Sequence, residues 1–157
     1  MERGADVQVL MTSAAARFVT PMTFHALTGR PPIADLFDPP EPAQVAHIEL
    51  AEAASLVVVA PCTANVLGKF AHGLADDVVT AVLMATRAPV LIAPAMNGRM
   101  YGSVPVQENV AILRTRGVHF IGPVTGKFAA PAEGEGEGRM SEPAEIVEAA
   151  FRLLGSG

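Results

Sequence analysis

Four short stretches of the sequence place small polar residues or an imidazole beside apolar runs. Thr12 and Ser13 follow "VQVLM", the segment "CTAN" (62–65) follows "LVVVAP", Asn97 follows "VLIAPAM", and His47 follows a proline-rich stretch. Hydroxyl and amide groups at such positions can donate hydrogen bonds to a polar ligand, and a neutral imidazole can accept a proton near pH 7. These residue types suit the binding of a polar ligand and proton transfer to or from it.

The segments that would position these residues alternate between short apolar runs and longer helical patterns. Apolar runs of strand length occupy residues 7–12, 55–61, 88–94 and 118–123. Helical patterns cover residues 13–29, 46–54, 63–86, 105–117 and 142–155, with a proline-rich loop at 30–45 and a Gly/Ala/Glu-rich loop before the last helix. We expect Ser13 to cap the first helix, Pro21 to interrupt it and Gly29 to end it. Gly68 and Gly73 should weaken the third helical pattern.

This alternation predicts right-handed crossovers and a parallel sheet. The expected fold class is α/β: a Rossmann-like (flavodoxin-like) doubly wound parallel sheet with four strong strands and three α/β/α layers, in one domain over residues 1–157. Ligands bind outside the carboxyl ends of the strands in such sheets. Since Thr12, "CTAN" and Asn97 all follow predicted strands, we expect them to meet in one site.

Composition excludes several classes of protein. Apolar residues make up 50% of the 157 residues and charged residues 17%, which predicts faces buried in the sheet and against other copies of the chain. The net charge of −5, without a basic cluster, argues against nucleic acid as a partner. No apolar run reaches the roughly 18 residues that span a membrane. No Cys/His cluster has metal-ligand spacing, and a single Cys62 suits a reducing, cytoplasmic location.

Three separate motifs carry a resemblance to a known family. They are "HIELAEAASLVVVAPCTANVLGKFAHGLADD" (47–77), "APAMNGRMY" (93–101) and "EGEGRMSEP" (135–143). In this order they resemble the flavin-dependent cysteine decarboxylase family, and within it the branch that acts on phosphopantothenoylcysteine in coenzyme A biosynthesis. The resemblance implies FMN as cofactor and decarboxylation of 4′-phosphopantothenoylcysteine to 4′-phosphopantetheine, a carbon–carbon lyase reaction whose electrons the flavin accepts and returns. It also implies a homotrimer, often gathered into a homododecamer.

The resemblance also assigns residues to roles. His47 matches the catalytic histidine, and the helix dipole at its position disfavours an imidazolium; a partly exposed histidine at a helix start is the structural alternative. Asn97 matches the residue that binds the substrate carboxylate, which an amide holds less firmly than a lysine would. The same asparagine can also cap the turn after its strand. We assign the cofactor to Thr12, Ser13, Thr63, Ala64, Asn65 and Ala95, and the substrate to Asn97, Met100, Ala130, Ala132 and Arg139.

Two features depart from the family pattern. Members begin with a strand and a glycine-rich turn that helps hold the FMN phosphate, followed by a helix. This chain opens at "MERGADVQVLMT", which resembles the end of that helix and the second strand, so roughly one βα unit of the family pattern is absent. We expect a misassigned start and weak FMN binding in this form. Members also carry a cysteine before "GRM" that supplies the last proton, whereas alignment places Ala130 or Ala132 there. Glu133 or Glu135 could supply the proton if an acidic, glycine-rich lid closes and raises the pKa of a glutamate. We assign Cys62 no catalytic role.

Two other functions stay open at this point. One is oxidative decarboxylation of a peptide's C-terminal cysteine, which ends at the enethiol and needs no acid cysteine. The other is a flavoprotein fold kept as a non-catalytic regulatory subunit, against which the presence of His47 and Asn97 argues. The colour of the purified protein would test for flavin, and mass spectrometry of the products would separate a saturated thiol from an enethiol.

Overall fold

The computed structural model describes residues 3–36, 46–127 and 135–155. These residues belong to two compact units, and each is described by itself. The first unit comprises Met1–Glu52 and Ala75–Thr86, and the second comprises Ala53–Leu74 and Arg87–Gly157. The expectation of one domain over residues 1–157 stays a prediction.

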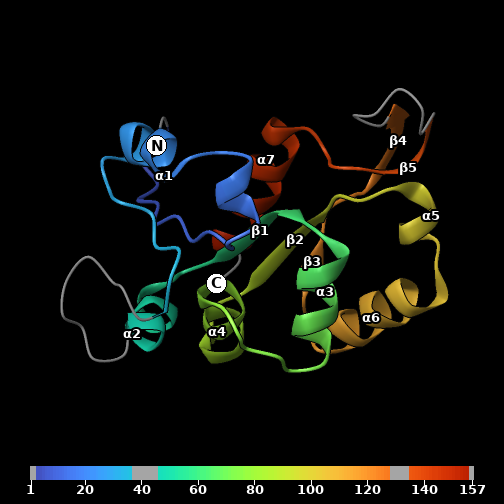
Figure 1. Cartoon of the computed structure of the whole chain (residues 1–157), viewed down its shortest axis with the longest axis horizontal. Coiled ribbons are helices and arrows are strands. Elements are labelled where there is room, and N and C mark those ends of the chain that lie inside the picture. The colour runs from blue at the N-terminus through green and yellow to red at the C-terminus, as the bar shows by residue number, and fades with distance from the viewer. Residues whose placement is uncertain (1–2, 37–45, 128–134, 156–157) are drawn as a thin grey trace. The chain divides into compact units, whose positions relative to one another are not determined.

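A parallel sheet forms the centre of the second unit (Figure 1). Its strands lie in the order β1 (Val57–Cys62), β2 (Val90–Pro94) and β3 (His119–Phe120). All five residues of β2 are buried, as expected of a strand with neighbours on both sides and helices on both faces. The third strand is shorter than the apolar run at 118–123 predicted, since Gly122 takes a φ of 72° and ends the extended backbone.

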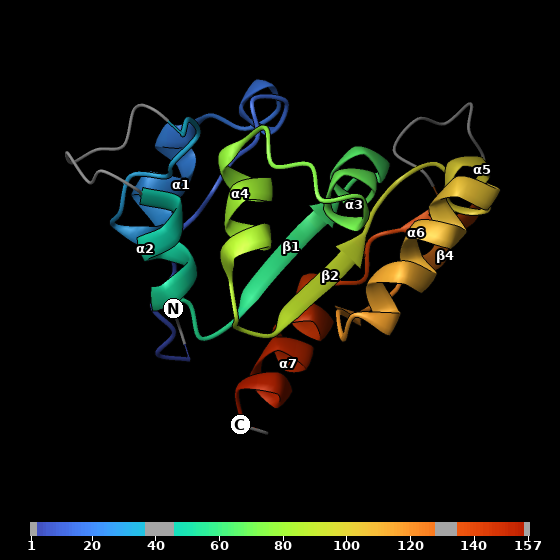
Figure 2. The same ribbon diagram turned by 90° about the horizontal axis from the view of Figure 1, so that it is seen from below.

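Helices cover both faces of this sheet (Figures 1 and 2). On one face α7 (Pro143–Leu154) packs through Ile146 against Leu91 and Ala93 of β2. On the other face α3 (Ala64–Ala71) lies beside α6 (Val104–Thr115). The Arg116 guanidinium donates a 2.7 Å hydrogen bond to the carbonyl oxygen of Ala71 and so ties the ends of α6 and α3 together.

The segment before α7 contains a hairpin where we expected only a loop. Strands β4 (Val124–Lys127) and β5 (Glu135–Arg139) pair antiparallel, with Thr125 opposite Glu137 and Gly126 opposite Gly136. The expectation was wrong for these residues because alternating glycine and glutamate present no apolar face, which is the signal that predicts a strand. The backbone ladder holds this hairpin without such a face.

In the first unit the strand expected at residues 7–12 is not formed. Leu10 makes a single parallel bridge to Ile33, flanked by hydrogen bonds from Met11 N–H to Ile33 O (2.9 Å) and from Ile33 N–H to Val9 O (3.0 Å). One bridge is not a ladder, so the apolar run stays extended without becoming a strand. Such a run becomes a strand only where a second extended segment lies beside it to pair with its backbone. The apolar pattern of one segment does not indicate whether that partner is present.

The first helical pattern breaks where its proline and glycine predicted. A 3-10 turn, η1 (Ala15–Arg17), precedes α1 (Pro21–Thr28), and Gly29 ends α1 in the left-handed conformation with a φ of 72°. The predicted Ser13 cap is wrong: Thr12 Oγ1 accepts the hydrogen bond from Ala15 N–H at 3.1 Å. Two adjacent hydroxyl residues make either cap equally plausible in the sequence, and the path of the chain selects Thr12.

The long pattern at 63–86 divides into α3 and α4 (Val78–Ala85). Gly73 has a φ of 71° just after α3, and Asp77 starts α4 with a capping box in which Thr80 is its partner. The single helical pattern predicted at 63–86 is therefore interrupted next to Gly73, one of the two glycines expected to weaken it. Gly68 lies inside α3 without interrupting it. A Cβ built on Gly68 would lie 3.5 Å from the side-chain amide nitrogen of Asn109 on α6.

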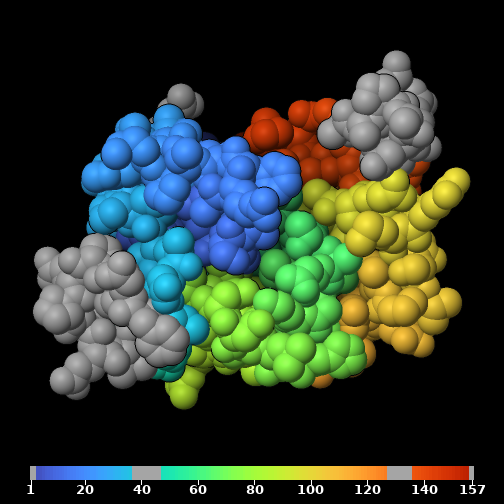
Figure 3. Space-filling view, in the orientation of Figure 1, coloured from blue at the N-terminus to red at the C-terminus, as the bar shows by residue number. Residues whose placement is uncertain are grey.

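Burial differs sharply between the helices. α4 is apolar around most of its circumference and buries Val78, Thr80, Ala81, Val82 and Leu83. α1 buries no residue, and the side chains of Phe18 and Met22 are 90% and 71% exposed; the blue surface in Figure 3 includes this segment. Within the part of the chain that the structure describes, no helix has both the length and the apolar character to cross a membrane.

Candidate functional site

The carboxyl ends of β1 and β2 bring two of the predicted motifs together. Ala95 N–H donates a 2.9 Å hydrogen bond to the carbonyl oxygen of Cys62. This bond extends the pairing of Cys62 with Pro94 past the end of both strands. The "CTAN" and "AMN" segments therefore leave the sheet side by side, as the parallel topology predicted.

Thr63 begins α3 as its N-cap. Its Oγ1 accepts a hydrogen bond from Val66 N–H at 3.4 Å, and its carbonyl accepts one from Leu67 N–H at 3.0 Å. The N–H groups of Ala64 and Asn65 precede Leu67, the first residue whose N–H donates within the helix, so they point out of the helix start. With Thr63 and Asn65 exposed and Ala64 half-buried, this loop presents hydrogen-bond donors on a surface with little side-chain bulk.

Asn97 caps the short helix α5 (Gly98–Tyr101). Its Oδ1 accepts from Arg99 N–H at 2.9 Å, and its carbonyl accepts from Tyr101 N–H at 3.0 Å. The capping half of the two-part expectation for Asn97 is therefore observed. The cap engages the oxygen of the amide, whereas binding of a carboxylate would use the NH₂ group, so the two uses are chemically compatible.

A third segment joins these two through the backbone of β5. Met96 N–H donates a 3.0 Å hydrogen bond to the carbonyl oxygen of Gly138, the residue before Arg139. Arg139 Nη2 donates to Glu142 Oε1 at 2.6 Å, with both side chains about half exposed. The Asn97 carboxamide and the Arg139 guanidinium thus start from neighbouring points of the backbone at one edge of the unit. This set of donors fits an anionic ligand.

Cys62 is buried where β1 meets this edge. Its side chain is fully enclosed, and burial raises the pKa of the thiol to about 12. A thiol with this pKa stays protonated at neutral pH and is a poor nucleophile. The geometry agrees with the assignment of Cys62 as a small packing residue.

His47, Thr12 and Ser13 belong to the first unit. His47 is the second residue of α2 (Ala46–Ala53) and is half-buried, which matches the predicted position at a helix start. Thr12 is half-buried and uses its Oγ1 in the cap described above, while Ser13 is exposed. Their roles toward a ligand stay predictions, because they are described within their own unit.

Several predicted residues have no described side chain. Ala130, Ala132 and Glu133 lie outside the described residues, and Glu135 is described only in its backbone. Met100 is described and is half exposed. The identity of a proton donor in this segment therefore stays an open prediction.

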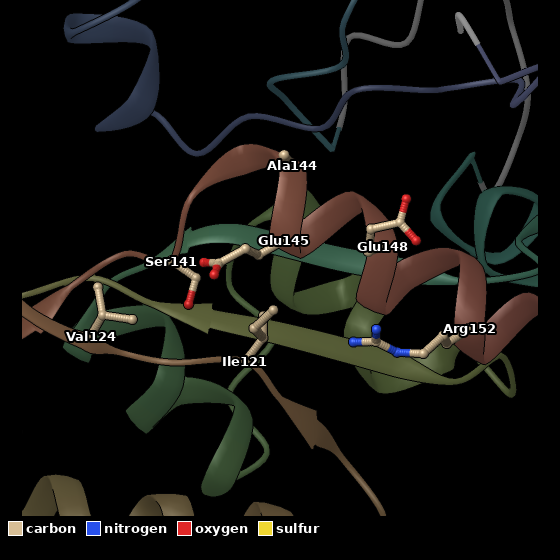
Figure 4. A pocket seen from close by; sticks show the side chains of 7 residues that line it. All are labelled: Ile121, Val124, Ser141, Ala144, Glu145, Glu148 and Arg152. Atoms are coloured by element: carbon tan, nitrogen blue, oxygen red, sulfur yellow. The ribbon is translucent and has the colours of Figure 1, made fainter.

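A hollow that the sequence did not predict lies at the start of α7 (Figure 4). It has a volume of about 510 Å³ and is lined by Ile121, Val124, Ser141, Ala144, Glu145, Glu148 and Arg152. Ser141 is 2% exposed, and a Cβ at Gly122 would lie 2.5 Å from its hydroxyl oxygen, so only glycine fits there. No motif links residues 121–124 to 141–152, so the sequence carried no signal for this hollow.

Among the described residues, no group of three or more His, Cys, Asp or Glu side chains could hold a metal ion. The donors at the edge formed by Thr63, Asn97 and Arg139 are hydroxyl, amide and guanidinium groups. Guanidinium and amide N–H groups repel or ignore cations, so this edge is built for an organic or anionic ligand.

Curated relatives match almost the whole chain. The coenzyme A biosynthesis bifunctional protein CoaBC of Vibrio vulnificus (strain YJ016) is 47% identical over 146 residues, which cover 93% of this chain and 36% of that protein. The protein of the same name from Bacillus subtilis (strain 168) is 45% identical over 150 residues, covering 96% of this chain and 36% of the relative. The chain thus spans about a third of the length of these relatives.

Solved structures share the fold. A cysteine-to-serine mutant of PPC decarboxylase complexed with pantothenoylaminoethenethiol superposes with a TM-score of 0.80 at 27% identity, covering 99% of this chain and 86% of that one. The FMN-dependent cysteine decarboxylase SpaF superposes with a TM-score of 0.78 at 32% identity, covering 94% and 79%. These similarities confirm the predicted flavodoxin-like α/β fold class and the resemblance to cysteine decarboxylases. Flavoprotein is the family whose pattern matches residues 1–155, and this chain belongs to it.

Proposed function

We propose that this chain is an FMN-dependent decarboxylase that converts 4′-phosphopantothenoylcysteine to 4′-phosphopantetheine, a step of coenzyme A biosynthesis. The observation that carries the proposal is the meeting of three motifs at one edge of the second unit. The bonds from Ala95 N–H to Cys62 O and from Met96 N–H to Gly138 O hold them together. The relatives named for coenzyme A biosynthesis and the PPC decarboxylase structure support the choice of substrate.

The residues at the start of α3 fit a flavin. An isoalloxazine ring is flat, with a polar edge that needs hydrogen-bond partners and a face that tolerates only small neighbours. Thr63, Ala64 and Asn65 offer backbone N–H groups, a hydroxyl and an amide with little bulk, and Ala95 adds a methyl group beside them. When bound, FMN supplies the reversible oxidation that makes loss of carbon dioxide feasible.

Asn97 orients the carboxylate that is lost. The amide NH₂ group donates a hydrogen bond to this carboxylate, while the cap on α5 fixes the side chain through its oxygen. A neutral donor stabilises the carboxylate less than a lysine would, so less binding free energy is lost as the charge leaves with carbon dioxide.

His47 and Arg139 complete the proposed assignment. His47, at the start of α2, accepts a proton from the substrate in its neutral form. Arg139, at the end of β5, binds an anionic group of the substrate. Thr12 and Ser13 are proposed to contact the cofactor.

A purified sample tests the proposal directly. Flavin absorbance should be present or should appear when FMN is added, and incubation with 4′-phosphopantothenoylcysteine should release carbon dioxide and yield the saturated thiol. Release of carbon dioxide with an enethiol as the product would refute the complete reaction and favour the oxidative chemistry of the alternative below. A flavin-loaded sample that leaves this substrate unchanged would refute the first reaction, and a peptide that ends in cysteine would then test the alternative.

The alternative is oxidative decarboxylation of a peptide's C-terminal cysteine to an enethiol. The presence of alanine at both candidate positions for the acid cysteine, Ala130 and Ala132, favours it. The 32% identity to the FMN-dependent cysteine decarboxylase SpaF is compatible with it. The higher identity to the coenzyme A proteins, 47% for the Vibrio vulnificus relative, favours the first reaction.

The proposed assembly is a homotrimer or a homododecamer in the cytoplasm. Helix α4 buries most of its residues in its own chain, so it offers little apolar surface to a second copy. The exposed apolar side chains of η1 and α1, with Phe18 at 90% and Leu27 at 65%, support a second surface for subunit contact. Light scattering tests the assembly.

A further inference from the structure

We infer that Glu142 is a positioning residue for substrate binding: its carboxylate holds the Arg139 guanidinium beside the Asn97 loop, with the other donors of the arginine left for an anionic group of the substrate. The inference rests on the proposed function, because that function assigns Arg139 to the substrate. Nothing in the sequence pattern singled out Glu142 for this role.

The contact itself is short and charge-assisted. Arg139 Nη2 lies 2.6 Å from Glu142 Oε1, and the side chains are 50% and 56% exposed. Most ion pairs with this exposure contribute little, because two long side chains must be ordered in water to form them. The value of this pair depends on whether its partners are already ordered by other contacts.

Glu142 is ordered by the start of α7. It is the N-cap of that helix, and its carbonyl oxygen accepts a 2.9 Å hydrogen bond from the backbone N–H of Glu145. Glu145 Oε2 accepts in return from Glu142 N–H at 3.1 Å. The backbone of Glu142 is therefore held at two points before its carboxylate reaches Arg139, which lowers the entropy cost of the pair.

Arg139 is ordered by the hairpin. A Cβ built at Gly126 on β4 would lie 2.9 Å from Arg139 Cδ, so the arginine stem crosses β4 where glycine leaves room. The pair joins the hairpin to α7 through an arginine stem that packs on β4 and a glutamate whose backbone is held at the helix start.

The position of this pair gives it a function. The N–H of Met96 donates a 3.0 Å hydrogen bond to the carbonyl oxygen of Gly138. Asn97 and Arg139 are the residues that follow these two partners in the chain. A guanidinium has five N–H donors, and the contact with Glu142 engages Nη2. The remaining N–H donors form a planar fork that suits a carboxylate or phosphate. The contact with Glu142 sets the direction in which this fork points.

Four variants separate this role from helix capping. Glu142→Ala removes both the cap and the contact with Arg139. Glu142→Asp keeps a preferred N-cap residue but shortens the side chain by one methylene, so the arginine is out of reach. Glu145→Ala breaks the capping box without touching Arg139. Glu137→Gln removes an exposed charge from the same strand and serves as the control for net charge.

Binding of 4′-phosphopantothenoylcysteine is measured by calorimetry, with thermal unfolding and steady-state kinetics on the same samples. We expect Glu142→Ala and Glu142→Asp to weaken binding about tenfold and to raise KM more than they lower kcat. Glu145→Ala should lower the melting temperature as Glu142→Ala does but bind within about twofold of the unaltered protein, as should Glu137→Gln. Equal binding by Glu142→Asp and the unaltered chain, or an equal loss in Glu145→Ala, would overturn the inference.

A second measurement needs no substrate. The ¹⁵N signal of the Arg139 Nε–H group, assigned with Arg139→Lys, should be distinct in the unaltered protein and collapse toward solvent-exposed arginine in Glu142→Ala and Glu142→Asp. An unchanged signal in both variants would show that Glu142 does not hold the guanidinium. A protein that neither binds nor decarboxylates the substrate would refute the proposed function, while this signal would still decide the contact between Glu142 and Arg139.

Discussion

Replacement of Asn97 can separate its two uses, because its oxygen caps α5 and its NH₂ group is proposed to bind the substrate carboxylate. Asn97→Asp keeps an oxygen for the cap on Arg99 N–H, so the melting temperature should stay near that of the unaltered protein. The same change replaces a hydrogen-bond donor by a negative charge. We therefore expect stability to be preserved and substrate binding to be lost.

The size of the loss follows from the position of Asn97. Two unit charges about 4 Å apart repel by about 4 kcal/mol at an effective dielectric constant near 20, and a half-buried side chain such as Asn97 retains about half of that. A lost hydrogen bond to a charged group adds about 1.5–3 kcal/mol. The sum corresponds to a fall in kcat/KM on the order of 10²- to 10⁴-fold.

Two further variants and one assay complete the test. Asn97→Ser keeps a capping oxygen and removes the amide, so kcat/KM should fall about 10- to 100-fold with the melting temperature maintained. Asn97→Ala also removes the cap and should lower the melting temperature by about 2–4 °C. Carbon dioxide release and thermal unfolding are measured on each protein. Unaltered kcat/KM in Asn97→Asp would refute the assignment of Asn97 to the carboxylate.

Three other predictions follow from the same structure. His47→Asn should abolish carbon dioxide release and leave flavin absorbance unchanged; turnover at the normal rate would remove His47 from the catalytic assignment. The pKa of the Cys62 thiol is raised from 9.0 to about 12, so the thiol stays protonated to a higher pH in the folded state than in the unfolded state. The difference in pKa stabilises the folded state in full below pH 9. As the pH rises from 9 toward 12, the free energy of unfolding falls by up to about 4 kcal/mol on this account. Alkaline unfolding curves should therefore be flatter for Cys62→Ala than for the unaltered protein, and parallel curves would contradict this. Light scattering should report a trimer or a multiple of it, and Phe18→Glu should shift it toward smaller species; a stable monomer of the unaltered chain at micromolar concentration would refute the assembly.

The hairpin shows why part of the candidate site could not be predicted. Residues 135–139 read as loop because glycine and glutamate carry neither β-branched bulk nor an apolar alternation, and Val124 and Thr125 form too short a run to predict a strand. Their pairing depends on backbone hydrogen bonds between two segments that are separate in the sequence. Arg139 ends this hairpin and Val124 lines the hollow beside α7, so neither the contact with Glu142 nor the hollow could be derived from motif spacing.

For residues 7–12 the error was the opposite one, because a strand was predicted that the structure does not form. Its short apolar run is typical of a buried strand, yet it forms one bridge to Ile33. An apolar pattern records that a segment is buried, as Met11 is at 2% exposure, and does not record whether a partner strand lies beside it. Strand formation is a property of two segments.

By itself the sequence determined the elements whose signals are local. The uninterrupted apolar run of β2, the proline start and glycine end of α1 and the break at Gly73 each follow from side-chain hydrophobicity or backbone φ, which a residue carries wherever it lies. The order of those elements also predicted a parallel sheet and placed "CTAN" and Asn97 at one edge. Only the tertiary structure decided which hydroxyl capped the first turn, how β4 met β5 and which carboxylate reached Arg139. In each case the candidates are either far apart in the sequence or equally suited to the role. The choice between them depends on distances that exist only once the backbone has folded.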